Sequence, residues 1–382
     1  MIKILHSGDI HLDSPFSQLP PDKAEVRKNE LRGTFTSLMT FARTENIDLM
    51  LIAGDFFDND FVTRETLALI ISEIGKLKCP VVISPGNHDF AREGSVWKKD
   101  IFPKNTFIFT SDELSSFEFP EIGVRVYGWA FTDPAMRQNP LAGHRAERDG
   151  LINVLCAHCD LIAPVGPSCP VSVRELEEFG ADYNALGHIH NPDEEGVFPK
   201  NVMYCGCLES RSYDETGPKG AVLCTVERDG GGAVRVSPQR IRFSKRRYEN
   251  MTLAVDGAST NYELKEKIAG LISERKLGAD TLLRVTLTGN VDESLVVNVG
   301  ELERSTDRLF SLTVRDETVP LLNASSLASD PTVRGEVYRL LLPLITSDDP
   351  EERARGSAAL RYSLAALAGE SVTTGENRQN SD

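Results

Sequence analysis

The chain has 382 residues, of which 40% are hydrophobic and 26% are charged, and its formal net charge is −15. This composition is typical of an ordinary globular protein. It argues against a simple DNA-binding module, because affinity for the phosphate backbone normally comes from clustered Lys and Arg. The acidic composition does not exclude a nuclease. Carboxylates in a nuclease site hold cations, and these cations supply the positive field that the substrate phosphate meets.

No apolar run approaches the ~20 residues that a bilayer span needs. The seven cysteines are an odd number scattered through apolar segments, which suits a reducing compartment better than a disulfide framework. We therefore expect a cytoplasmic protein that does not contact a membrane.

The first part of the chain alternates short apolar runs with helix-period stretches. Runs rich in Ile, Val and Leu predict buried strands at residues 2–6, 48–53 and 80–84. Between them, residues 22–46 and 63–77 are predicted helices, with Asp22 and Thr63 as N-caps. This alternation predicts a layered α/β domain with a largely parallel sheet.

Further apolar runs follow with fewer helices between them, at residues 124–129, 153–157, 183–187, 202–205 and 221–226. We interpret them as a second, more antiparallel sheet packed on the first. A glycine run at residues 230–232 predicts a turn, and residues 238–249 are interpreted as the passage into a second unit.

From Tyr248 the pattern restarts with predicted strands at 251–255, 281–288 and 309–315. Predicted helices lie at residues 261–274, 330–346 and 350–368. The polar residues 371–382 predict a disordered tail.

Five of the seven histidines fall in short motifs where predicted strands end. The motifs are Gly8-Asp9-Ile10-His11, Gly54-Asp55-Phe56-Phe57-Asp58, Gly86-Asn87-His88-Asp89, the single His158, and Gly187-His188-Ile189-His190. In open α/β sheets, sites form beyond the carboxyl ends of the strands. In a locally extended segment, residues two apart point the same way, so Asp9 and His11 can hold one cation. The glycines let the backbone turn tightly.

A mixed set of Asp, Asn and His suits divalent metals such as manganese, iron or zinc. Two metals ~3.5–4 Å apart would activate a water and clamp both oxygens of an in-line displacement at phosphorus. Any one of these motifs alone would be weak evidence for a metal site. Their order and number together disfavour the alternative, in which they are unrelated turn and core residues.

The succession of these motifs resembles the signature of the calcineurin-like metallophosphoesterases and, within them, the SbcD/YhaO-type DNA repair exonucleases. Three further stretches also resemble these exonucleases, namely segment 11–16, the turn at residues 204–209 and segment 219–223. The resemblance covers residues 1–245, and the remainder only loosely. We expect a four-layer α/β/β/α sandwich at residues 1–243, a small α/β capping domain at 248–347 and a C-terminal helix at 348–370.

The resemblance implies two metal sites that share one carboxylate. The first would be held by Asp9, His11, Asp55 and His190. The second would be held by Asp55, Asn87, His158 and His188. We expect two divalent ions, with manganese favoured over iron or zinc.

His88 matches a non-ligand histidine that stabilises the transition state or protonates the leaving oxygen. Asp58 is interpreted as the residue that orients His88. Asp89 is interpreted as a loop-capping carboxylate.

The function we expect is two-metal hydrolysis of DNA phosphodiesters, as a 3′→5′ exonuclease with some endonuclease activity in DNA repair. The partners implied are DNA and an SbcC-like or YhaN-like ATPase, with a homodimer left open. One alternative keeps the chemistry and changes the substrate, to a small phosphodiester or a phosphoprotein. Another is a non-catalytic scaffold that recruits an ATPase, although a scaffold has no need of His88.

Several other residues receive a plainer interpretation. His6 is expected to be a core or outer-sphere histidine, and His144 to be solvated. Four cysteines have spacings that would allow a zinc site, namely Cys156, Cys159, Cys205 and Cys207. We favour the interpretation that they are buried free thiols.

The dense basic stretch at residues 240–247 is interpreted as a solvated linker, with a DNA contact as the alternative. Of the last two predicted helices, the first is expected to close the capping domain. The second is expected to present an uncovered apolar stripe, from Leu360 to Leu367, to the ATPase.

Overall fold

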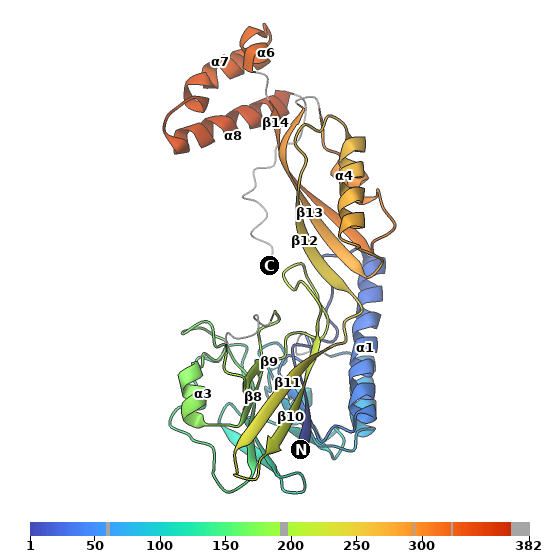
Figure 1. The fold of residues 1–382 in the computed structure, drawn as a ribbon, viewed down its shortest axis with the longest axis vertical. Helices are drawn as coiled ribbons and strands as arrows, with labels where there is room; N and C mark the ends of the chain where they lie inside the picture. The colour runs from blue at the N-terminus through green and yellow to red at the C-terminus, as the bar shows by residue number, and fades with distance from the viewer. Residues whose placement is uncertain (59–61, 192–197, 293–294, 322–323, 368–382) are drawn as a thin grey trace. The chain divides into compact units, whose positions relative to one another are not determined.

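A computed structural model describes residues 1–58, 62–191, 198–292, 295–321 and 324–367. The chain divides into two compact units, Met1–Glu249 and Asn250–Asp382 (Figure 1). The predicted tail at 371–382 and the last predicted residues of the helix before it lie outside the described residues. Within the described residues, no helix combines the length and the apolar character that crossing a membrane requires.

The first unit contains a six-stranded sheet in the order β11-β10-β1-β2-β3-β4. Four strands run parallel, namely β1 (Ile2–Ser7), β2 (Leu49–Ala53), β3 (Val81–Ser84) and β4 (Thr106–Ile108). The others, β10 (Gly220–Arg228) and β11 (Val234–Arg242), extend the sheet antiparallel from β1. Strands β2 and β3 are buried at every position, as expected of central parallel strands covered on both faces.

The second sheet of this unit has five strands in the order β5-β6-β7-β8-β9. They are β5 (Ser115–Phe119), β6 (Val124–Gly128), β7 (Ile152–His158), β8 (Tyr183–Gly187) and β9 (Val202–Tyr204). Strands β6 to β9 pair parallel, and only β5 pairs antiparallel.

The expectation of a more antiparallel second sheet was therefore wrong, and the run at 221–226 belongs to the first sheet. Parallel pairing requires only a long crossover, which need not be a helix. The connection from β6 to β7 is such a crossover, because it is an irregular loop without helical periodicity.

The two sheets face each other, with helices on their outer sides. The core between them joins Ile52 and Ile83 of the first sheet to Val154 and Ala185 of the second. Helices α1 (Pro21–Thr44) and α2 (Arg64–Gly75) cover the first sheet, and the short α3 (Val173–Phe179) covers the second. A single-turn 3₁₀ helix lies at Val96–Lys98. The mixed α/β architecture with two central sheets is thus confirmed.

The helix ends follow local chemistry. Thr63 caps α2 as predicted, because its side chain accepts a hydrogen bond from the amide of Thr66. Asp22 is not an N-cap, because α1 begins at Pro21, whose fixed φ suits the first helical position. The unpredicted α3 starts at a capping box formed by Ser172 and Glu175.

The second unit contains a three-stranded sheet, β12-β13-β14, in which β13 and β14 pair parallel. Its strands are β12 (Arg247–Ala254), β13 (Thr281–Asp292) and β14 (Ser311–Leu321). Helix α4 (Asn261–Glu274) has the predicted bounds and packs Leu264, Ile268 and Ile272 into the core of this unit, beside the short α5 (Val299–Glu303).

Three further helices form a small cluster of their own, α6 (Ala324–Ser329), α7 (Val333–Ile345) and α8 (Pro350–Leu367). Leu360 of α8 is buried against Leu327 and Tyr338, with Leu364 packed beside them. The stripe expected to be uncovered on α8 is therefore largely covered by α7. Leu367, at the end of that stripe, is 50% exposed, and α7 has further exposed apolar residues, with Val333 at 64% and Leu340 at 70%.

Candidate metal centre

Four of the expected metal ligands have left-handed backbone conformations, with φ of 45° at Asp9, 50° at His11, 49° at Asp55 and 106° at His188. Such conformations cost on the order of 1–3 kcal/mol each and persist only where the surroundings fix them. Here the amide of Asp9 donates to the carbonyl of Gly54 at 3.0 Å, and that of His11 to the carbonyl of Asp55 at 2.9 Å. The first motif is therefore a strained turn rather than the extended segment that we expected.

The first expected metal set converges in space. Ligand atoms of Asp9, His11, Asp55 and His190 all lie within 4.8 Å of one another. Nε2 of His11 lies 3.2 Å from Nε2 of His190, which in turn lies 3.8 Å from Oδ1 of Asp9. Three of the four side chains are buried, and His190 is partly exposed at the rim.

The charges in this cluster favour the binding of a cation. Among the described residues, the ion-pair partners of Asp9 and Asp55 are histidines rather than Lys or Arg. Burial raises the pKa of the Asp9 carboxyl, although the neighbouring His190 opposes that shift. Buried carboxylates without a full counter-charge are costly. Two carboxylates with imidazoles around them form a donor set that fits a divalent metal.

The second expected set gathers around His158. Its Nδ1 lies 3.1 Å from the carbonyl of Ala53, so Nδ1 carries the proton and Nε2 presents its lone pair. Nε2 faces Oδ1 of Asn87 at 2.9 Å, and a cation shared by these two acceptors would satisfy both. The ring of His188 stands 5.2 Å from the ring of His158. Burial and His158 together lower the pKa of His188 to about 4, so that the imidazole is neutral and able to bind a metal near pH 7.

Asp55 lies between the two sets. Its Oδ2 is 3.6 Å from Nε2 of His11 and 3.5 Å from Nε2 of His158. A Cβ on Gly86 would collide with the Asp55 carboxylate, and one on Gly54 would collide with the His158 ring. The two glycines are therefore required by close approach, and the shared carboxylate has the placement expected of a bridging ligand.

His88 is exposed at the rim of this cluster. Its Nδ1 lies 3.0 Å from the backbone carbonyl of Asp58, which leaves Nε2 free for a substrate. The carboxylate of Asp58 does not orient His88. It accepts a 2.7 Å hydrogen bond from Arg211 and lies 3.2 Å from Nδ1 of His11. His11, Asp58 and His88 also lie close enough to hold a cation, but the guanidinium on Asp58 disfavours one there.

Asp89 has the capping geometry expected of it. Its carboxylate accepts hydrogen bonds from the amides of Gly86 and Phe56, both at 2.8 Å. Burial, followed by the charge of Asp55, raises the pKa of Asp89 to about 7. Through these two hydrogen bonds Asp89 holds the Gly54–Asp58 motif against the Gly86–Asp89 motif.

Sequence reasoning gave no role to three charged residues of the site. Glu215 lies 2.8 Å from Nδ1 of His190, Arg211 links Glu215 to Asp58, and Lys219 holds the His190 carbonyl at 3.3 Å. The resemblance of the turn at 204–209 to the exonucleases pointed at this loop but ended before Arg211. One residue of that turn, Glu209, is a buried anchor that accepts from Arg27 and Thr34, each at 2.8 Å.

The plainer interpretations agree with the structure. His6 is buried with Nδ1 3.0 Å from the Tyr183 hydroxyl, and His144 is exposed. All seven cysteines are free and buried, and among the described residues the possible metal clusters contain no cysteine.

The basic stretch is largely tied to the protein itself rather than forming a solvated linker. Arg240 lies on β11 and donates to the carbonyls of Tyr204 and Cys205 at 3.0 and 3.1 Å. Arg246 pairs with Glu30 through two nitrogens.

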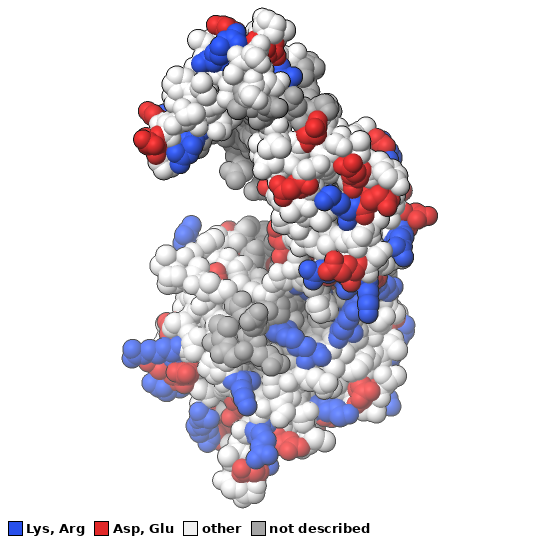
Figure 2. Space-filling view, turned by 45° about the horizontal axis from the view of Figure 1, so that its top comes forward, with Lys and Arg blue, Asp and Glu red and all other residues white. Residues whose placement is uncertain are grey.

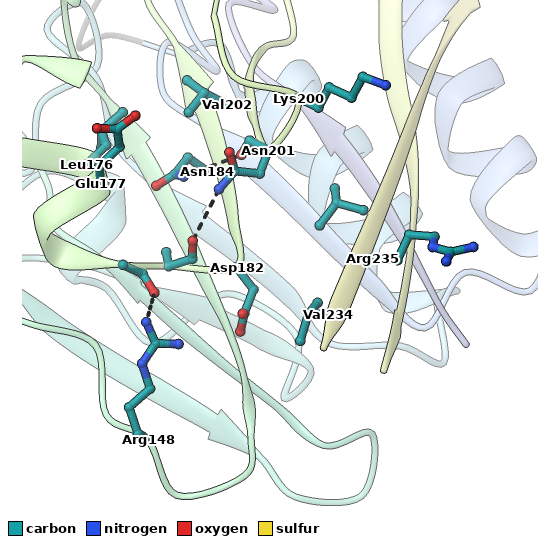
Figure 3. A pocket seen from close by; sticks show the side chains of 13 residues that line it. Arg148, Leu176, Glu177, Asp182, Asn184, Lys200, Asn201, Val202, Val234 and Arg235 are labelled. Carbon is teal, nitrogen blue, oxygen red and sulfur yellow. Dashed lines mark hydrogen bonds between the residues drawn. The ribbon is translucent and has the colours of Figure 1, made fainter. Parts of the chain in front are cut away.

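A separate cavity of about 560 Å³ opens elsewhere on the first unit (Figure 3). It lies beside the end of α3, where Arg148 donates to the carbonyl of Gly180 at 3.1 Å, and its wall includes Lys200 and Arg235. Its lining contains none of the expected metal ligands.

The fold and the cluster define a metallophosphoesterase: residues 2–192, half of the chain, match the calcineurin-like phosphoesterase family, and the chain belongs to it. Among curated relatives, an uncharacterized metallophosphoesterase YhaO of Bacillus subtilis is 29% identical over 77% of this chain and 74% of its own length.

Two relatives described as DNA double-strand break repair protein Mre11 are more distant. That of Methanopyrus kandleri is 25% identical over 70% of this chain and 62% of its own length. That of Halobacterium salinarum is 24% identical over 82% of this chain and 77% of its own length. A crystal structure of Chaetomium thermophilum Vps29 matches with 11% identity and a TM-score of 0.24, over 63% of this chain and 97% of that chain, too weakly to carry an argument.

Proposed function

We propose that this protein hydrolyses DNA phosphodiesters, as a 3′→5′ exonuclease with some endonuclease activity in DNA repair. The observation that carries the proposal is an exposed His88 at the rim of two converging ligand sets that share Asp55. The substrate class is supported by the Mre11 relatives, whose names place them in DNA double-strand break repair.

In this proposal, Asp9, His11, Asp55 and His190 hold one divalent ion, and Asp55, Asn87, His158 and His188 hold the other. Manganese suits the mixed oxygen and nitrogen donors, as do iron and zinc. When bound, such ions supply a nucleophilic water at neutral pH and neutralise charge on the phosphate.

The chain's own residues orient the reaction. The Nδ1 proton of His88 is held by the Asp58 carbonyl, so in the imidazolium form the second proton, on Nε2, can be donated to the phosphate or passed to the leaving oxygen. The buried Asp9 and Asp55 exclude bulk water from one side of the site. His88 thus acts on the reacting group from the open side.

The acidic balance of the chain is compatible with a DNA substrate. On the face shown in Figure 2, basic and acidic side chains of the described residues are interspersed. Arg246 is already paired with Glu30, and Arg211 at the site is paired with Asp58 and Glu215, so bound cations would add to the positive field that the phosphate meets.

We further propose that the C-terminal part acts on access to this site, with residues 248–347 as a capping domain. Val333, Leu340 and Leu344 of α7, at 64%, 70% and 40% exposed, form an apolar stripe at helical spacing. We assign to this α7 stripe the docking of an SbcC-like or YhaN-like ATPase.

The test uses the full chain loaded with manganese and end-labelled duplex and hairpin DNA. We expect mononucleotides released progressively from 3′ ends, and no release in EDTA. Cleavage of bis-p-nitrophenyl phosphate with every DNA end left intact would overturn the DNA assignment in favour of a small phosphodiester. Inactivity on both substrates, with two metals bound, would favour a scaffold.

A further inference from the structure

Two of the proposed ligand histidines have a carboxylate on the side that faces away from the metal set. Nδ1 of His190 lies 2.8 Å from Oε1 of Glu215. Nδ1 of His11 lies 3.2 Å from Oδ1 of Asp58, a close contact that lacks the geometry of a hydrogen bond. The Nε2 atoms of these histidines are the ones that approach each other, at 3.2 Å. Each ring is thus placed between a carboxylate and the metal set.

The protonation state of His190 follows from its surroundings. Nδ1 has two neighbours, Glu215 at 2.8 Å and a nitrogen of Arg211 at 3.1 Å. A carboxylate accepts and a guanidinium only donates, so the two cannot both bond to Nδ1. The 2.8 Å contact with a carboxylate oxygen is therefore a hydrogen bond donated by Nδ1, so Nδ1 carries the proton and Nε2 presents its lone pair.

One guanidinium joins the two carboxylates. Arg211 donates to Oδ1 of Asp58 at 2.7 Å and to Oε1 of Glu215 at 3.0 Å. Its side chain is 16% exposed, and Glu215 also accepts from the Arg211 amide at 2.5 Å. The guanidinium group of Arg211 is therefore held by a carboxylate on each side. A planar guanidinium can bridge two carboxylates in this way better than an ammonium group can.

We propose that Asp58, Arg211 and Glu215 form a brace that positions His11 and His190, so that both Nε2 atoms face the same metal ion. This inference rests on the proposed metal assignment and makes Arg211 and Glu215 positioning residues. Carboxylates behind ligand histidines fix the tautomer and ring orientation, and their loss typically lowers metal affinity about 10- to 100-fold.

The positive charge of Arg211 allows a positioning role to be distinguished from a merely electrostatic one. Removing a positive charge beside a cation site should tighten cation binding by Coulomb attraction alone. Removing a brace should loosen it. The sign of the change in affinity therefore separates the two roles.

The experiment is a manganese titration of the full chain, followed by electron paramagnetic resonance of free Mn²⁺, without DNA. For Arg211→Gln we expect one of the two sites to weaken roughly 10-fold or more, with the second site unchanged. Arg211→Lys, which keeps the charge but not the fork, should weaken the same site. Glu73→Gln is the matched control, because Glu73 is also buried and paired, with Arg43 and Lys76, but contacts no expected ligand.

Equal or tighter Mn²⁺ binding by Arg211→Gln would overturn the brace. If that variant fails to fold in circular dichroism, Arg211→Lys decides, and wild-type affinity in it would overturn the proposal. Because the readout is metal binding, a protein that binds manganese as expected but cleaves no DNA would contradict the nuclease proposal and leave the brace intact.

Discussion

The backbone amide of His88 donates a 2.9 Å hydrogen bond to Oδ1 of Asp55. The third motif is therefore held to the shared carboxylate by main chain, and the imidazole of His88 is not needed for that contact. Ligand geometry and the chemistry proposed for His88 can consequently be separated by substitution.

His88→Ala should keep both metals, because the amide that meets Asp55 remains. Its turnover of bis-p-nitrophenyl phosphate should fall by roughly 10²–10⁴, the usual effect of losing a general acid or base. Metal content by elemental analysis and steady-state rates provide the test. Loss of a metal ion in His88→Ala would contradict its assignment as a non-ligand.

Asp55→Ala should give the opposite pattern, with both metals depleted and activity lost together. The reason is that Asp55 Oδ2 lies within 3.6 Å of a histidine from each set. Elemental analysis beside His88→Ala makes the comparison direct. If Asp55→Ala retained two metals, the shared-ligand role would be wrong.

The sequence was informative where chemistry is concentrated in short motifs. The motifs that follow the apolar strands predicted a site at the ends of those strands, and the first ligand set implied by the family resemblance converges there. Strand connectivity was less predictable, because nothing local shows that residues 221–226 pair with β1. Arg211 and Glu215 escaped prediction since their partners are Asp58 and His190, which lie in other motifs and meet them only after folding.

Acid should destabilise the protein partly through His6. Burial lowers the pKa of His6 to about 3 from its ordinary 6.5, so between these values the unfolded chain binds one more proton. Stability therefore rises with pH through this window and is lost as pH falls below 6.5, by up to about 1.4 kcal/mol per pH unit.

His6→Asn, which keeps a partner for the Tyr183 hydroxyl, should flatten that dependence in urea unfolding of the metal-free protein. The matched control is His144→Asn, because His144 is exposed and outside the core. An identical pH slope in His6→Asn and the wild type would contradict the assignment.

The buried pair of Arg27 and Glu209 should contribute to stability in a way that exposed pairs do not. The two groups meet at 2.8 Å with both side chains fully buried. Glu209→Gln removes one of the two carboxylates that pair with Arg27 and leaves Glu30 in place at 2.6 Å, so it should cost roughly 1–3 kcal/mol of unfolding free energy. Glu178→Gln, which breaks an exposed pair with Arg174, should leave unfolding unchanged. Equal urea midpoints for Glu209→Gln and wild type would refute this.

The α7 stripe should matter for association and not for folding. Leu340→Lys should abolish co-purification with the candidate ATPase while leaving the melting temperature unchanged, because Leu340 is 70% exposed. Leu360→Ala, in the covered face of α8, should lower the melting temperature instead. Undiminished co-purification of Leu340→Lys would reject the stripe as the docking surface.

The place of β1 in its sheet has a consequence for biosynthesis. This N-terminal strand lies between β2 and β10, and Leu5 pairs with Leu223. A ribosome must therefore release the chain as far as β10 before β1 gains its second neighbour, and pairings across such sequence distances form slowly. His190, too, emerges long after Asp9. The nascent protein should thus be unable to complete its metal site until the chain beyond His190 has left the ribosome.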